Sequence, residues 1–171
     1  MDVMSSSFAV ISLAIQLLET TQKIRSFLHD VRDAPKEIIR LTELLDQLHG
    51  TLDNVKSLLE QQYLVLRLPG SPVHMIRALE NCEKTMQQLE SVVKKAKESF
   101  GHQQCVKRTW ASMRFASTRE TIRELQDQLR DAKADLQGAI SSNTWQLQYR
   151  TSSFDKVELT NIAQDAYSPS H

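Results

Sequence analysis

The chain has 171 residues, of which 40% are hydrophobic, and its 21 basic and 21 acidic side chains cancel. This composition is enough for one sizeable core, and the balanced charge does not favour a nucleic-acid partner. Two cysteines are too few for a disulfide framework and no leader-like segment is seen, so a cytoplasmic setting is expected. Only four glycines and four prolines interrupt the chain, which favours long helices and an all-α fold.

The first predicted helix covers residues 6–30, where apolar residues recur at helical spacing from Val10 to Val31. Residues 3–18 carry no charge, which is unusual for a bundle helix. The apolar members of this run are Phe8, Val10, Ile11, Leu13, Ile15, Leu17 and Leu18. Because a membrane span needs about 20 residues, burial in a core is the simpler interpretation. The alternative is a helix that leaves the bundle and enters a membrane or contacts a partner.

A junction follows in the sequence Asp30-Val31-Arg32-Asp33-Ala34-Pro35-Lys36-Glu37. Pro35 has no amide hydrogen and a fixed φ, so it fits the first turn of a helix and disfavours helical geometry in Ala34. A second helix is predicted over 35–62. Its apolar residues alternate steps of three and four, as in a heptad seam: Ile38, Leu41, Leu45, Leu48, Leu52, Val55 and Leu59.

Pro69 and Gly70 end that helical stretch, and a third helix is predicted over 72–99. Its seam consists of Met75, Leu79, Cys82, Met86, Leu89, Val93 and Ala96. Residues Val106 to Phe115 suggest a short connecting helix whose aromatic side chains cover one end of the core. Ser117 and Glu120 have the spacing of a capping box.

The capping box opens a fourth predicted helix over 117–147. Its seam is formed by Ile122, Leu125, Leu129, Ala132, Leu136 and Ala139, and Trp145 is a candidate extension of it. Residues 149–171 are polar with weak periodicity, so a mobile C-terminal tail is expected there.

Helices of comparable length with apolar stripes and short links pack as an antiparallel four-helix bundle. We therefore expect a helical-bundle domain over 1–148, with the short connecting helix, and a disordered segment over 149–171. An extended coiled coil is the competing interpretation, because a seam does not reveal whether its partner helix belongs to the same chain. The breakers near Pro35, Pro69 and Gly101 favour folding back.

Catalytic and cofactor motifs are not recognised in the sequence. The glycines are isolated, so neither a phosphate loop nor a dinucleotide fingerprint can be assembled. The five histidines are scattered, and neither cysteine has a second ligand at metal spacing. We expect no enzyme, no cofactor and no metal.

A basic segment lies between the third and fourth predicted helices. Its cations are Lys94, Lys95, Lys97, Lys107, Arg108, Arg114, Arg119 and Arg123, and with Glu98 and Glu120 the net charge is +6. Such a patch suits an anionic membrane surface or an acidic partner. The alternative is a solvated helix end whose charge is offset by acidic residues elsewhere in the fold.

The uncharged first helix, the junction Asp30 to Glu37 and the leucine seam that follows it resemble a known family. It is the fungal N-terminal domain of STAND and NACHT-type proteins, of the HeLo-like kind also named after azaphilone pigment cluster protein L. Trp110 before a final helix rich in Glu, Arg and Leu matches more weakly. The resemblance covers residues 8–60, and more loosely 72–140.

The resemblance implies a helical signalling or cell-death module that works upstream of a nucleotide-binding oligomerisation region. We therefore expect a non-enzymatic module that associates through its helices with itself or with related N-terminal helical domains. In related death-inducing members the first helix attacks membranes, which maps here onto Phe8 to Leu18 and gives an alternative, a membrane-active effector peripheral to a membrane. A structural coiled-coil protein is a second alternative.

Overall fold

The computed structural model describes residues 3–31, 34–62, 73–99 and 118–166. Side chains are described for residues 8–31, 34–62, 73–95, 119–146 and 148. These residues form four helices: α1 (Val3–His29), α2 (Lys36–Glu60), α3 (Val73–Ser99) and α4 (Thr118–Ala166). The expected all-α bundle is confirmed, whereas the connecting helix predicted over 106–115 lies outside the described residues.

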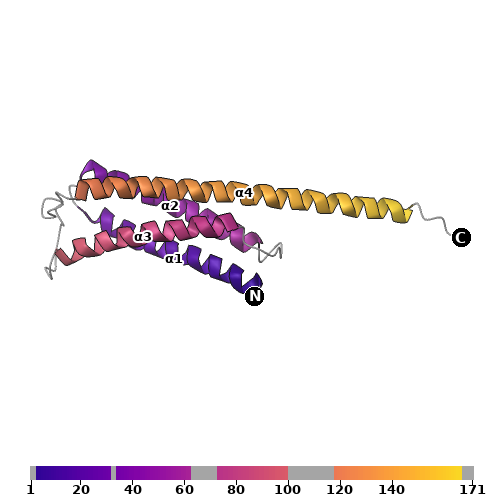
Figure 1. Ribbon diagram of the computed structural model, residues 1–171, viewed down its shortest axis with the longest axis horizontal. Coiled ribbons are helices and arrows are strands. Elements are labelled where there is room, and N and C mark those ends of the chain that lie inside the picture. Colours follow the sequence, from indigo (N-terminus) through magenta and orange to yellow (C-terminus); the bar gives the residue numbers. More distant parts are fainter. Residues whose placement is uncertain (1–2, 32–33, 63–72, 100–117, 167–171) are drawn as a thin grey trace.

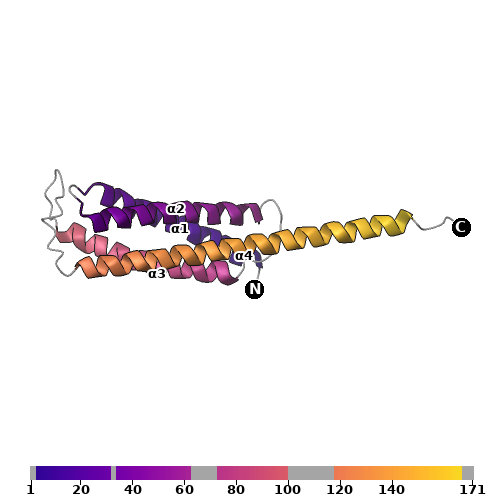
Figure 2. The same cartoon turned by 90° about the horizontal axis from the view of Figure 1, so that it is seen from above.

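The four helices stand at the corners of a bundle (Figures 1 and 2). The main contacts join α1 to α2 and α3, and α4 to α2 and α3. Successive helices run in opposite directions, as predicted. Because α1 lies diagonally opposite α4, the neighbours α2 and α4 run parallel, as do α1 and α3.

The core consists of the predicted apolar seams. Every described residue of those seams is buried, with the exception of the candidate extension Trp145. Leu45, Leu48 and Leu52 of α2 have no exposed surface. Each fully buried side chain of this size stabilises the fold by roughly 1.5–3 kcal/mol relative to exposure. The heptad pattern therefore identified the faces that turn inward.

Pro35 lies immediately before α2 and not within it. Its backbone has φ −65° and ψ 161°, and its carbonyl accepts the amide hydrogens of Ile38 at 2.9 Å and Ile39 at 3.2 Å. Proline suits this position because it lacks the amide hydrogen that would have no helical partner there. The extended ψ turns the chain at the predicted junction between α1 and α2. α2 therefore begins at Lys36, one residue later than the predicted start at Pro35.

Polar contacts set the register of the parallel pair α2 and α4. They run from the amide of Gln126 to the Glu37 carbonyl (2.7 Å), from Lys133 Nζ to Gln47 Oε1 (2.6 Å) and from Asn143 Nδ2 to Gln62 Oε1 (3.0 Å). Asn143 and Gln62 are only 2% and 4% exposed. A buried amide pair favours one helix register, since a slip would break the hydrogen bond between the two buried amides.

The structure corrects the predicted role of Trp145. Its side chain is 68% exposed, so it does not continue the core seam of α4. Asn143 occupies that inward position instead. The steps of three and four from Leu136 and Ala139 lead to Asn143, and Trp145 lies two residues further, which places it on the opposite side of the helix.

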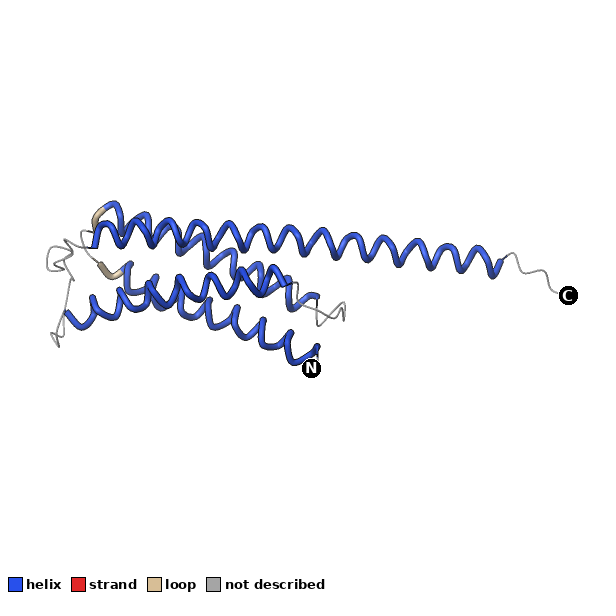
Figure 3. Tube along the Cα trace, in the orientation of Figure 1, coloured by secondary structure: helices blue, strands red, loops and turns tan. Residues whose placement is uncertain are grey.

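α4 continues well beyond the other helices (Figure 3). Its 49 residues correspond to a length of about 73 Å. Residues 149–166, in the segment predicted as a mobile tail, are helical, because neither proline nor glycine occurs between Gly138 and Pro169 to stop the helix. The predicted helix end at 147 is thus corrected to Ala166, while the division into segments 1–148 and 149–171 stays a prediction.

Candidate interaction surfaces

The apolar residues of α1 divide between the core and the surface. Val10 and Leu17 belong to the core. Ile11, Leu13 and Leu18 are half-buried and pack against it. Phe8 and Ile15 are 65% and 37% exposed. The seven residues predicted as a membrane or partner helix therefore do not share one face.

Phe8, Ile11, Ile15 and Leu18 form a second stripe beside the buried face, and we call it the α1 stripe. Their spacing of three and four residues places them on one side of the helix. The outer part of the stripe is open to solvent at Phe8 and Ile15. An exposed apolar stripe on a helix is a feature of surfaces that bind a protein or a membrane.

The predicted basic patch is only partly described. Lys94 and Lys95 near the end of α3 and Arg119 and Arg123 near the start of α4 are exposed. Because α3 and α4 are antiparallel neighbours, these four side chains come to the same end of the bundle. Lys107, Arg108, Arg114 and the side chain of Lys97 lie outside the described residues.

Acidic residues interrupt this end of the bundle. Glu120 and Glu124 are exposed on the same turns of α4 as Arg119 and Arg123. These two carboxylates offset part of the positive charge of Arg119 and Arg123. Its role as a lipid or acidic-partner site stays a prediction.

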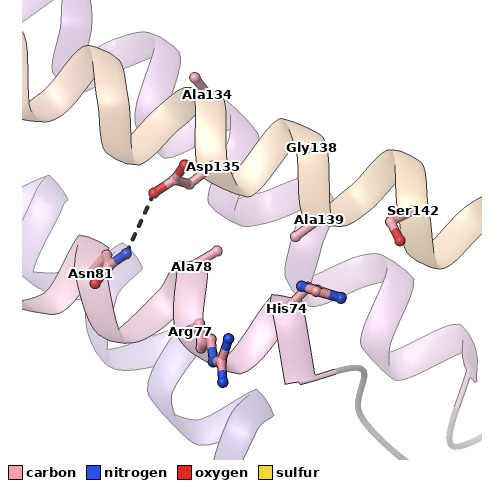
Figure 4. Close-up of a pocket in the computed structure, with 9 residues that line it drawn as sticks. All are labelled: His74, Arg77, Ala78, Asn81, Ala134, Asp135, Gly138, Ala139 and Ser142. Carbon is pink, nitrogen blue, oxygen red and sulfur yellow. Dashed lines mark hydrogen bonds between the residues drawn. The ribbon is translucent and has the colours of Figure 1, made fainter.

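A hollow lies between the start of α3 and the middle of α4 (Figure 4). It has a volume of about 410 Å³. On the α3 side it is lined by His74, Arg77 and Asn81, and on the α4 side mainly by Asp135 and small residues, including Gly138. Asn81 donates from Nδ2 to Oδ2 of Asp135 at 3.4 Å. The small side chains of α4 leave this hollow open.

A second hollow follows along the same groove, towards the end of α3. Its volume is about 590 Å³, and Lys84 and Gln88 of α3 face Glu124 and Gln128 of α4 across it. Both hollows lie between α3 and α4, and we call the surface that they form the α3/α4 groove. Sequence reasoning missed it, although the separate charge patterns of the two helices were available as a signal.

The described residues offer little for catalysis. Within them, no group of three or more His, Cys, Asp or Glu side chains is placed to hold a metal ion. Burial raises the pKa of the Cys82 thiol to about 12, so this side chain stays protonated and packs as an apolar residue.

Comparison with known proteins gives one family. The model of the SesA family, described as the N-terminal domain on NACHT_NTPase and P-loop NTPases, matches residues 11–136. The matched region begins in α1 and ends in α4, so it takes in parts of all four helices. No curated protein and no solved structure matches the chain.

Proposed function

The chain belongs to the SesA family of N-terminal domains on NACHT and P-loop NTPases, and from this premise we propose that it is a non-enzymatic signalling module. It acts by helix-mediated association with a second copy of itself or with related N-terminal helical domains. The family is described as an N-terminal domain on NACHT and P-loop NTPases, and this association with NTPases supports the role as a signalling module. The mode of action by association is our inference.

The observation that carries the proposal is the extent of the family match. Residues 11–136 take in all of α2 and α3, most of α1 and the first part of α4. The family match therefore covers the helical bundle. A bundle contacts other molecules through the outer faces of its helices. Here these faces include the α1 stripe and the α3/α4 groove.

The non-enzymatic part of the proposal rests on the chemistry of the two hollows. Their linings are mainly amide, small and singly charged side chains. Cys82, the one cysteine in the described region, is buried with a raised pKa and is a poor nucleophile.

Association can be measured on the purified chain. Sedimentation equilibrium would give its mass as a function of concentration. A pull-down with a purified SesA-type domain from a NACHT protein would test association with related N-terminal domains. We expect a rise in mass with concentration, capture of the related domain, or both. A chain that stays monomeric at high concentration and captures no related domain would contradict the proposal.

Exposure of Phe8 and Ile15 supports a second candidate, a membrane-active effector that uses α1. In the described residues, no helix is long and apolar enough to cross a bilayer. Co-sedimentation of the purified chain with anionic vesicles would test binding to a membrane surface. The informative variant is Phe8→Glu, because Phe8 is exposed and its replacement does not disturb the core. A charge at Leu17 would be less informative, because Leu17 is in the core and the variant could unfold. Absence of wild-type binding would rule this candidate out.

A further inference from the structure

The two edges of the α3/α4 groove carry opposite charge. The cations Arg77 and Lys84 lie along the α3 edge, and Glu124 and Asp135 lie along the α4 edge, with Asp131 one turn before Asp135 on the same side of α4; all five are exposed. The α3 side of both hollows contains no acidic residue, and the α4 side contains no basic residue. The groove therefore separates a positive edge from a negative edge along its length.

These charges are not paired with one another across the groove. Three ion pairs among the described residues join Arg25 to Asp46, Lys56 to Glu60 and Arg130 to Asp127. None of them connects α3 with α4. A polar link between the two edges is the hydrogen bond from the Asn81 amide to Asp135, and Figure 4 shows Arg77 extending away from α4.

Oppositely charged edges side by side make a face that is complementary to itself. We propose that the α3/α4 groove binds a second copy of this chain, with the two copies related by a two-fold axis parallel to the helices. In that arrangement α3 of each copy lies against α4 of the other. This inference rests on the proposed function, because it names the surface and partner through which the module associates.

The register of α3 and α4 supports this axis. The contact between Asn81 and Asp135 places these residues at the same level of the bundle. Since the helices are antiparallel, Lys84 lies level with Asp131. A two-fold axis parallel to the helices keeps each residue at its level, so Lys84 of one copy faces Asp131 of the second copy, twice.

The other two-fold arrangement is disfavoured by charge. An axis perpendicular to the helices within the same face would set α3 against α3 and α4 against α4. Positive edges would then meet, as would negative edges, and like charges in an interface are unfavourable. The charge pattern therefore selects between the two symmetric ways of pairing this face.

The size of the face predicts the strength of the dimer. From His74 to Val92 the groove runs about 27 Å, and two neighbouring helices are roughly 20 Å wide, so each copy would bury about 500 Å². The total of about 1,000 Å² is at the lower end for a specific interface. We expect a weak dimer that salt weakens further. Both projecting α4 helices would leave it at the same end.

Charge reversal tests this arrangement. Lys84→Glu and Asp131→Arg should each weaken dimerisation at least about tenfold in sedimentation equilibrium, because each places two like-charge pairs in the interface. Mixing the two variants should restore association to within about threefold of wild type. In the mixed dimer the two introduced charges face each other with opposite sign, and the second contact keeps the native pair of Lys84 and Asp131. Lys23→Glu, an equal charge change at an exposed position of α1, should leave dimerisation unchanged.

The outcomes separate this inference from the proposed function. If wild type dimerises and neither reversal weakens the dimer, the surface is wrong while association stands. If wild type stays monomeric but captures a related N-terminal domain, the inference is overturned and the proposed function survives. Thermal melts of the variants should match wild type, because Lys84 and Asp131 are exposed.

Discussion

Ile38 and Ile39 are adjacent in the first turn of α2, yet their surroundings differ. Ile38 is 4% exposed and belongs to the core, whereas Ile39 is 49% exposed. Replacing each by alanine removes the same atoms and changes helix propensity by the same amount. The difference between Ile38→Ala and Ile39→Ala therefore reports the orientation of α2 with the local helix effects cancelled.

Burial predicts a large difference between the two variants. Ile38→Ala should cost about 3 kcal/mol, because each buried methylene contributes about 0.8 kcal/mol and a cavity is left behind. Ile39→Ala should cost less than about 1 kcal/mol, since much of its side chain is already in water. For a chain of this size the first change lowers Tm by roughly 6–12 °C.

Circular dichroism at the helical band would follow urea and thermal unfolding of both variants beside wild type. We expect a gap of about 2 kcal/mol or more in the free energy of unfolding between the two variants. Equal losses would mean that α2 does not present the described face to the core. Loss at Ile39 alone would refute the heptad reasoning for the helix.

Three further predictions concern buried side chains that carry a hydrogen-bonding or titratable group. Thr21 is buried and its Oγ1 donates to the Leu17 carbonyl at 2.7 Å. Thr21→Val should leave stability within about 1 kcal/mol of wild type in urea unfolding, because that carbonyl keeps its helical amide partner; a loss above that would contradict this. Asn143→Leu should cost about 1–3 kcal/mol by withdrawing the donor from Gln62, and adding Gln62→Leu should recover part of the loss; no recovery in the double variant would argue against a paired role. The raised pKa of Cys82, about 12 against an ordinary value of 9.0, means that the folded state holds this proton more tightly than the unfolded state. The free energy of unfolding should therefore fall as pH rises from about 9 towards 12, and Cys82→Ala should remove that fall; an unchanged pH slope in the variant would show that another group causes it.

The core could be predicted because burial imposes a strict period on each helix. Leu45 and Leu129 were expected inside and both are buried. The order of the helices around the core was not accessible in the same way, since a seam does not specify its partner. The polar contact of Asn143 with Gln62 depends on that order, so it appeared only in the structure.

The extension of α4 and the α3/α4 groove could not be predicted from the sequence, and the physical causes differ. Residues 149–166 are rich in polar side chains, which suggested a tail, but a helix continues wherever no breaker stops it. The α3/α4 groove depends on charges from helices that are apart in sequence, such as Lys84 and Asp131. Each helix alone looks like an ordinary solvated face, and only their juxtaposition creates two oppositely charged edges.

The central claim is that this bundle acts by helix-mediated association. Its most direct test is sedimentation equilibrium of the purified wild-type chain over a wide concentration range, at about 50 mM and about 500 mM salt. The account predicts a mass that rises from monomer towards dimer with concentration, and rises less at high salt. A single monomeric mass at every concentration and at both salt levels would contradict self-association of this module.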